Sequence, residues 1–242
     1  MRSLRNLGLT VGASSVVLLA ASGCGAAKHG ENANLIVGKQ QFVAKCGACH
    51  TLARAETKGT VGPNLDEVFA RSIDEGLGRN TIRSVVQGQV ENPNPEGAMP
   101  RGLASGAVLN DISSYVETSA DRRGKDTGLL ATAVAPAGSG KPAEEKAGKL
   151  ELEASPTGQL AYTTAKAIAQ PGSVTISMKN MSGVTHNVAI QSGTSGPVLG
   201  ASALQPKGTS SFTVKLKPGT YTFFCQAPGH RAAGMLGTLT VK

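Results

Sequence analysis

The stretch CQAPGHRAAGM, residues 225–235, decides the fold of the C-terminal part of this chain. Its first residue, Cys225, follows an apolar run from Tyr221 to Phe224 that is typical of a β-strand. His230 and Met235 come next at C-x4-H-x4-M spacing, on a segment that also contains Gly and Pro. A thiolate, an imidazole and a thioether on one short loop suit a transition metal. We therefore expect a metal-binding loop that begins where a strand ends.

A second imidazole is available upstream, in Thr185-His186-Asn187-Val188. A lone Cys at a strand end is usually a small buried hydrophobe, and a lone His more often has a structural role. Two imidazoles, one thiolate and one weak thioether in a single strand-rich segment form the ligand set of a type 1 (blue) copper site. We expect His186, Cys225, His230 and Met235 to bind one type 1 copper ion. Such a set serves both Cu(I) and Cu(II), which favours electron transfer.

Apolar and polar residues alternate after Leu150, for example over 173–178 and 211–216, and this pattern predicts half-buried strands. About 90 residues of short strands separated by turns suit a small β-sandwich. Together with the ligand loop, these features make residues 150–242 resemble the plastocyanin/auracyanin-like cupredoxins. The resemblance implies an all-β Greek-key sandwich that holds type 1 copper.

The same resemblance gives Asn187 a role near the copper, where it ties the ligand loops together. Gln226 stands directly after the Cys, where the family often has Thr or Ser. No second Cys completes a C-x3-C arrangement, so the dinuclear copper centre of oxidase subunit two is excluded.

The N-terminal half carries Cys46-Gly47-Ala48-Cys49-His50. Two thiols at this spacing can add to the two vinyl groups of a haem, and the adjacent imidazole then reaches the iron. A redox dithiol would not need the His, a zinc site lacks a second Cys pair, and a local disulfide is the other alternative. We expect one covalent haem c, attached through Cys46 and Cys49, with His50 as an axial ligand.

The opposite face of that iron needs a second ligand. Met99, in Gly97-Ala98-Met99-Pro100, lies in a Gly/Pro-rich loop, which is a poor place for a core residue. Met99 is therefore the expected second axial ligand. A His/Met pair fills both axial positions and favours electron transfer over oxygen chemistry.

Residues 35–120 resemble the class I c-type cytochromes. The resemblance rests on the haem motif, Met99-Pro100 and a further set of residues: Gly38, Phe42, Gly62-Pro63-Asn64-Leu65 and Tyr115. Apolar positions over 34–46 fit one helical face, and a second helical stretch is expected near 108–116. The resemblance implies an all-α fold in which Gly38 and Phe42 pack against the last helix near Tyr115. It also implies that the Pro63 carbonyl accepts a hydrogen bond from His50 Nδ1.

Residues 1–23 resemble a bacterial export signal, with two Arg followed by an apolar run from Leu7 to Ala21. That run is short for a membrane helix, which needs about 20 residues. Ala21-Ser22-Gly23-Cys24 resembles a lipoprotein box, with Ala where Leu is usual, and implies an acylated Cys24. Ordinary cleavage that leaves Cys24 as a free thiol is the alternative.

Residues 121–149 are rich in Ala, Gly, Pro and Lys and have no periodic apolar pattern, which predicts a flexible linker. The expected organisation is a signal peptide at 1–23, a tether at 24–34, a cytochrome c domain at 35–120, this linker, and a cupredoxin domain at 150–242. His29, in the tether, has no partner at ligand spacing.

The net charge of +8 is unevenly distributed. Residues 25–120 hold 9 basic and 10 acidic side chains, whereas residues 151–242 hold 7 and 2. No basic run is interleaved with aromatics, so nucleic-acid binding is not supported. As a hypothesis, the slightly acidic haem domain docks transiently on the basic copper domain, with a salt-sensitive contact.

These features predict a lipid-anchored electron carrier of the bacterial envelope, on the outer face of the cytoplasmic membrane or in the periplasm. It is a non-enzyme with no catalytic residues and no evident small-molecule substrate. The expected partners are redox proteins such as a quinol-oxidising complex, a terminal oxidase or a denitrification enzyme. One alternative is an electron-donating fusion to a copper reductase such as nitrite reductase, but a catalytic copper would need about three more imidazoles. The other, a copper-storage lipoprotein, leaves the haem motif unexplained.

Overall fold

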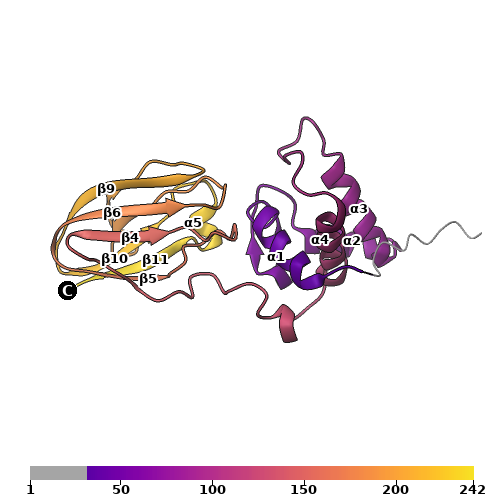
Figure 1. Cartoon of the computed structure of the whole chain (residues 1–242), viewed down its shortest axis with the longest axis horizontal. Helices are drawn as coiled ribbons and strands as arrows, with labels where there is room; N and C mark the ends of the chain where they lie inside the picture. The colour runs from indigo at the N-terminus through magenta and orange to yellow at the C-terminus, as the bar shows by residue number, and fades with distance from the viewer. Residues whose placement is uncertain (1–31) are drawn as a thin grey trace, which may run out of the picture.

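The computed structural model describes residues 32–242. A helical domain is followed by a β-sandwich, and a connecting segment runs between them (Figure 1). The expected signal peptide, Cys24 and His29 lie outside the described residues. Within the described part, no helix combines the length and apolarity needed to cross a membrane.

The helical domain contains four α-helices and a short hairpin: α1 (Leu35–Lys45), β1 (Thr51–Leu52), β2 (Thr57–Lys58), α2 (Leu65–Asp74), α3 (Arg79–Glu91) and α4 (Gly106–Ser119). Helix α1 begins after Asn34, whose side chain accepts hydrogen bonds from the backbone N–H groups of Ile36 and Val37 and so caps the helix. The sequence predicted α1 and α4, whereas α2 and α3 were not predicted.

Helices α1 and α4 cross at a glycine. A β-carbon on Gly38 would lie 2.2 Å from the Asp111 carbonyl oxygen, so only glycine allows this close approach. One turn further along α1, the Phe42 ring packs on Tyr115 with 6.3 Å between ring centroids. Both side chains are fully buried, and the expected packing of the first helix on the last is confirmed.

The segment from Asp121 to Lys149 differs from the expected flexible linker. Asp126 is buried against the helical domain, and a 3-10 turn at Gly128–Leu130 directs Leu130 and Val134 onto the same core. These contacts hold the segment on the helical domain, because they bury the apolar side chains of Leu130 and Val134 and pair the charge of Asp126.

The other end of this segment already belongs to the sandwich. Gly140 N donates to Thr163 O, and β3 (Ala143–Glu144) pairs with β5 (Lys166–Ala169). Only a few residues around 135–137 therefore belong to neither domain, and the expected long flexible linker is corrected to a short connector.

The sandwich has two sheets, ordered β3-β5-β11-β10-β7-β8 and β4-β6-β9. Its remaining strands are β4 (Lys149–Glu153), β6 (Gly172–Asn180), β7 (Ala189–Ser192), β8 (Val198–Ala201), β9 (Gly208–Leu216), β10 (Gly219–Phe224) and β11 (Leu236–Val241). The chain passes repeatedly from one sheet to the other, as in Greek-key sandwiches. Strands β6 and β9 pair antiparallel and alternate between buried and more exposed residues, which confirms the predicted pattern.

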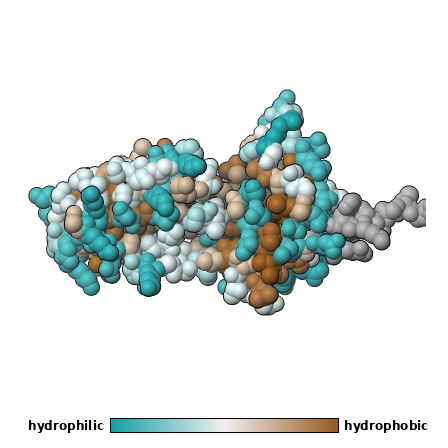
Figure 2. Space-filling model, in the orientation of Figure 1, coloured by the Kyte–Doolittle hydropathy of each residue, from teal (hydrophilic) through white to brown (hydrophobic). Residues whose placement is uncertain are grey.

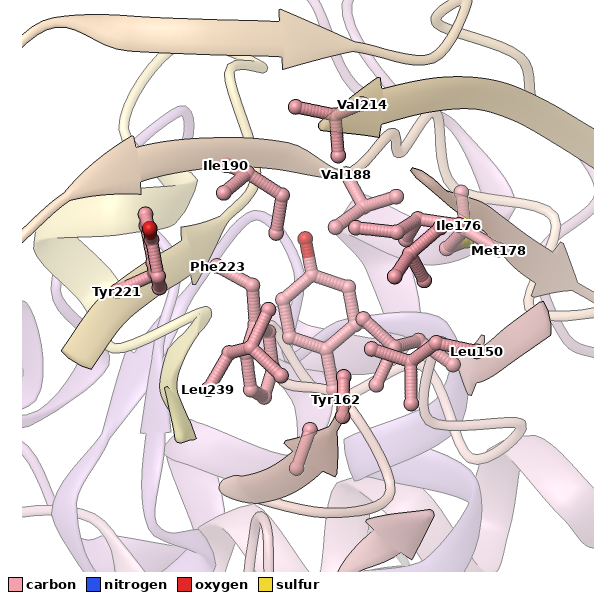
Figure 3. Close-up of a cluster of buried hydrophobic side chains, with 14 of the residues drawn as sticks. Leu150, Tyr162, Ile176, Met178, Val188, Ile190, Val214, Tyr221, Phe223 and Leu239 are labelled. Carbon is pink, nitrogen blue, oxygen red and sulfur yellow. The ribbon is translucent and has the colours of Figure 1, made fainter. Parts of the chain in front are cut away.

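The core between the two sheets surrounds Tyr162 (Figure 3). Its ring meets Phe223 edge-on at 5.2 Å between centroids, and its hydroxyl donates to the Asn187 carbonyl at 2.7 Å. Asn187 follows His186, so this hydrogen bond links the centre of the core to one of the expected copper ligands.

Candidate functional site

Three of the four expected copper ligands meet at one end of the sandwich. His186 precedes β7, Cys225 directly follows β10, and His230 opens the short helix α5 (His230–Ala233). Their donor atoms all lie within 4.8 Å of one another. Cys225 Sγ is 3.6 Å from His230 Nδ1 and 3.9 Å from His186 Nδ1, and the two Nδ1 atoms are 3.1 Å apart.

These separations fit one metal ion among the three atoms. Bonds of about 2.0–2.1 Å to nitrogen and about 2.3 Å to sulfur, as zinc forms, span such a triangle. His186 and Cys225 are fully buried and His230 is half-buried, so the donors are fixed by their surroundings. Two imidazoles and one thiolate form a soft donor set that suits copper.

Burial sets the protonation of these groups. It lowers the pKa of His186 to about 4, with a further contribution from the neighbouring His230, and it also lowers the pKa of His230. Both imidazoles are thus neutral at pH 7 and able to bind metal. Burial raises the pKa of the Cys225 thiol, although backbone hydrogen bonds from Asn187 and Ala227 oppose the rise. Metal binding must therefore displace a proton from this thiol.

Met235, the fourth expected ligand, is fully buried in the same core as Cys225. Its carbonyl accepts a hydrogen bond from Cys225 N, and its own N–H donates to His230 O. The loop between the Cys and the Met is therefore closed by its own backbone hydrogen bonds. Gly229 and Gly234 bracket α5 with positive φ angles, which permit the tight turns.

Asn187 joins the two ligand segments through hydrogen bonds. Its Oδ1 accepts from Gln226 N at 2.8 Å, and its Nδ2 donates to Gln226 Oε1 at 2.9 Å and to Ser202 O at 3.0 Å. Gln226 therefore hydrogen-bonds to Asn187 through both its backbone and its side chain. No local sequence signal identifies Ser202 as a partner, because two strands, β7 and β8, separate it from Asn187.

Arg231, directly after His230, also holds the ligand loop and was not predicted. Its guanidinium stacks 4.1 Å from the centre of the Phe224 ring and donates to Gln191 Oε1 at 2.7 Å. It also reaches the Thr194 carbonyl at 3.2 Å. The pattern of a cation beside a ligand His was visible in the sequence, but its partners were not.

A cavity of about 920 Å³ with a mostly apolar lining lies on the helical domain, and a few sandwich residues complete its wall. Cys46, Cys49, His50 and Met99 all line it, so the fold brings together residues that lie up to 53 positions apart. Valines at its edge, among them Val61 and Val85, remain exposed, and apolar side chains reach the surface of this domain in Figure 2. A large apolar ligand would cover such side chains.

The orientation of His50 is fixed within this cavity. Its Nδ1 lies 2.9 Å from the Pro63 carbonyl oxygen, which leaves Nε2 as the ring nitrogen that could bind a metal. A β-carbon on Gly62 would lie 2.4 Å from His50 Cε1, so the ring sits in a space that only glycine leaves open. A fixed imidazole and an uncovered apolar wall together fit a planar, iron-bearing group.

The other residues expected to hold the haem also have close neighbours or are buried. Gln89 Nε2 approaches Met99 Sδ at 3.9 Å, a contact that no sequence pattern suggested. Burial raises the pKa of the Cys46 thiol to about 12, with the nearby Cys49 adding to the rise, and burial also raises the pKa of Cys49. Both thiols are free of disulfides among the described residues.

A two-sheet sandwich whose loops bring two His, one Cys and one Met together is a cupredoxin-like copper electron-transfer domain. Residues 149–242 match the family model described as copper binding proteins, plastocyanin/azurin family, and this segment is a cupredoxin domain. No match was found among curated proteins.

Several solved structures are similar to this part of the chain. The reduced auracyanin of Roseiflexus castenholzii is 25% identical, covers 40% of this chain and 99% of its own, and has a TM-score of 0.36. Auracyanin A, a "blue" copper protein of Chloroflexus aurantiacus, is 25% identical, covers 39% of this chain and 98% of its own, and has a TM-score of 0.35. Rusticyanin of Thiobacillus ferrooxidans is 22% identical, covers 43% of this chain and 84% of its own, and has a TM-score of 0.34.

Proposed function

We propose that this chain is an electron-transfer protein with two metal centres, one haem c in the helical domain and one type 1 copper in the cupredoxin domain. One observation carries the proposal: the described residues place a CxxCH motif and a loop Met on one apolar cavity, in the same chain as a His-Cys-His copper cluster. Neither centre needs a catalytic residue, so the protein acts as a carrier and not as an enzyme.

Each chain segment would have a defined part in this function. Cys46 and Cys49 would hold the haem covalently, and His50 and Met99 would bind its iron. His186, Cys225, His230 and Met235 would bind the copper. When bound, both groups supply one-electron chemistry.

Restraint of these ligands is the contribution of the protein. The Pro63 carbonyl would orient His50, and Asn187 would keep the two copper-ligand segments in register. Ligands that are already fixed rearrange little between oxidation states, which favours fast electron transfer.

The cellular setting forms part of the proposal. An acylated Cys24 would anchor the chain to the bacterial envelope, at the outer face of the cytoplasmic membrane or facing the periplasm. The partners would be redox proteins such as a quinol-oxidising complex, a terminal oxidase or a denitrification enzyme. No small-molecule substrate and no nucleic acid is proposed.

Absorption spectra of the chain, produced with haem maturation factors and copper, test both centres. We expect an intense blue thiolate-to-copper band and the bands of a low-spin, covalently bound haem. Cys225→Ser should abolish the blue band and leave the haem, whereas Cys49→Ser should do the reverse. Met178→Leu, at an equally buried Met outside both sites, should change neither spectrum and serves as the control.

Copper bound without a blue band would support storage and contradict electron transfer at that site. Absence of covalent haem in the presence of maturation factors would remove the haem half of the proposal.

A further inference from the structure

The two domains touch through uncharged residues of helix α1 and of loops in both domains. A β-carbon on Gly158 of the sandwich would lie 2.5 Å from the Ala44 carbonyl oxygen of α1, so the two backbones are in close contact. A β-carbon on Gly229, beside the copper ligand His230, would lie 3.3 Å from Thr60 Oγ1. In Figure 1 the α5 end of the sandwich faces the helical domain on the side of α1.

The connector reinforces this contact on the same face of α1. Gln40 lies one helical turn before Ala44, and its side chain donates to Ala133 O at 2.9 Å. Two residues later, Ala135 O accepts a hydrogen bond from Gln159, the residue after Gly158. The connector and the sandwich loop thus both rest on one surface of α1.

The contact also borders the cavity of the helical domain. Pro156 and the segment 182–184 of the sandwich line that cavity together with Cys46 and His50. Among the described residues no ion pair joins the two domains, because all the observed ion pairs lie within the sandwich or within the helical domain and its connector. The expected electrostatic docking of an acidic domain on a basic one is therefore not what this interface shows.

We propose that the helical domain and the cupredoxin domain form one fixed unit, docked through these uncharged residues. The docking does not depend on the metals. Its role rests on the proposed function: it places residues 60–62, at the edge of the haem cavity, beside Gly229 and His230. One electron can then pass between the two centres without an external carrier, one centre being oxidised as the other is reduced.

Nuclear magnetic resonance relaxation of the full chain, reduced so that both centres are diamagnetic, tests the docking. We expect one rotational correlation time for both domains, unchanged when salt is raised to about 0.5 M, because screening acts on charged contacts only. Gly158→Ala should abolish this equality, since the new methyl group would strike Ala44. Gly193→Ala is the matched control, because Gly193 also has a positive φ but a methyl group there would meet no neighbour within 4 Å.

A second pair of variants does not depend on glycine strain. Thr60→Arg should also separate the correlation times, because it puts a long cationic side chain against a basic domain, whereas Thr60→Ser should not. The docking would be overturned by two different correlation times in the wild type, or by a difference that appears when salt is raised. It would also be overturned if Gly158→Ala and Thr60→Arg both kept a single correlation time. Absorption of the same samples tests the proposed function separately, since colourless protein with a single correlation time would reject only that function.

Discussion

Replacing Asp126 with Asn should strongly destabilise the helical domain. Asp126 Oδ2 lies 3.1 Å from Lys39 Nζ and accepts a hydrogen bond from the Tyr115 hydroxyl at 2.8 Å. The side chains of Asp126 and Lys39 are only 2% and 6% exposed. Breaking a buried ion pair by removing one charge costs about 3–5 kcal/mol, because the other charge stays buried without a partner.

The structure places the expected loss near the lower end of that range. Lys39 keeps a hydrogen bond to the Leu130 carbonyl at 2.8 Å, and the amide oxygen of the substituted side chain could still accept from Tyr115. Arg54 also faces Asp126, at 3.6 Å, but it is partly exposed and adds little. We therefore expect the free energy of unfolding to fall by about 3 kcal/mol.

Guanidinium unfolding of the full chain, followed by the helical circular dichroism signal, measures this loss. Lys125→Ala is the control, since Lys125 is the neighbouring residue and its ion pair with Glu56 is exposed, so a change below about 0.5 kcal/mol is expected. The double variant Lys39→Met with Asp126→Asn should recover at least about half of the loss, because no charge is then left buried. A loss in Asp126→Asn no larger than that of Lys125→Ala would refute the reasoning.

Three further outcomes follow from the two sites. Asn187→Ala should weaken copper affinity about 10–100-fold in a chelator competition, because it removes the hydrogen bonds that join the ligand segments; unchanged affinity would contradict this role. Gly62→Ala should displace the His50 ring and give a high-spin fraction in the electron paramagnetic resonance spectrum of the ferric haem, and a purely low-spin spectrum would argue against it. In the metal-free chain, His186 stays neutral in the folded state down to about pH 4, whereas in the unfolded state it takes up a proton near pH 6.5. The free energy of unfolding should therefore be highest above pH 6.5 and should fall as the pH is lowered toward 4. The loss is on the order of 3 kcal/mol, since one pKa unit is about 1.4 kcal/mol; thermal unfolding across this range measures it, and a flat profile would contradict it.

The candidate residues of both sites could be picked out from the sequence because each motif is short and its spacing has a direct meaning. Cys225, His230 and Met235 lie on one loop, and the apolar run before Cys225 indicated that this loop begins where a strand, β10, ends. Helix α2 also carried a usable signal that was not used, since Leu65, Phe69 and Ile73 recur every four residues along one face.

The connector shows what composition cannot predict. Its Ala, Gly and Pro content indicated flexibility, yet it is held by Asp126, Leu130 and Val134. Their partners include Lys39 and Tyr115, which lie on two different helices and far away in the sequence. The hydrogen bond that the Gln226 side chain accepts from Asn187 was equally unpredictable, because it depends on how the ligand loop folds back toward Asn187. Such contacts arise from tertiary packing, so no local pattern could have located them.

The neutral interface also changes what the basic charge of the cupredoxin domain implies. Residues 151–242 carry 7 basic and 2 acidic side chains, and six of the seven basic residues are lysines with exposed side chains. Lys179 pairs with Glu153 within the sandwich. Since no ion pair joins the domains within the described residues, the other five lysines remain available to an acidic partner. We therefore expect raised salt to slow electron exchange with an acidic external partner while it leaves exchange within the chain unchanged. Stopped-flow and flash-photolysis rates on the same preparation separate the two, and equal salt dependence of both would show that the internal contact is electrostatic after all.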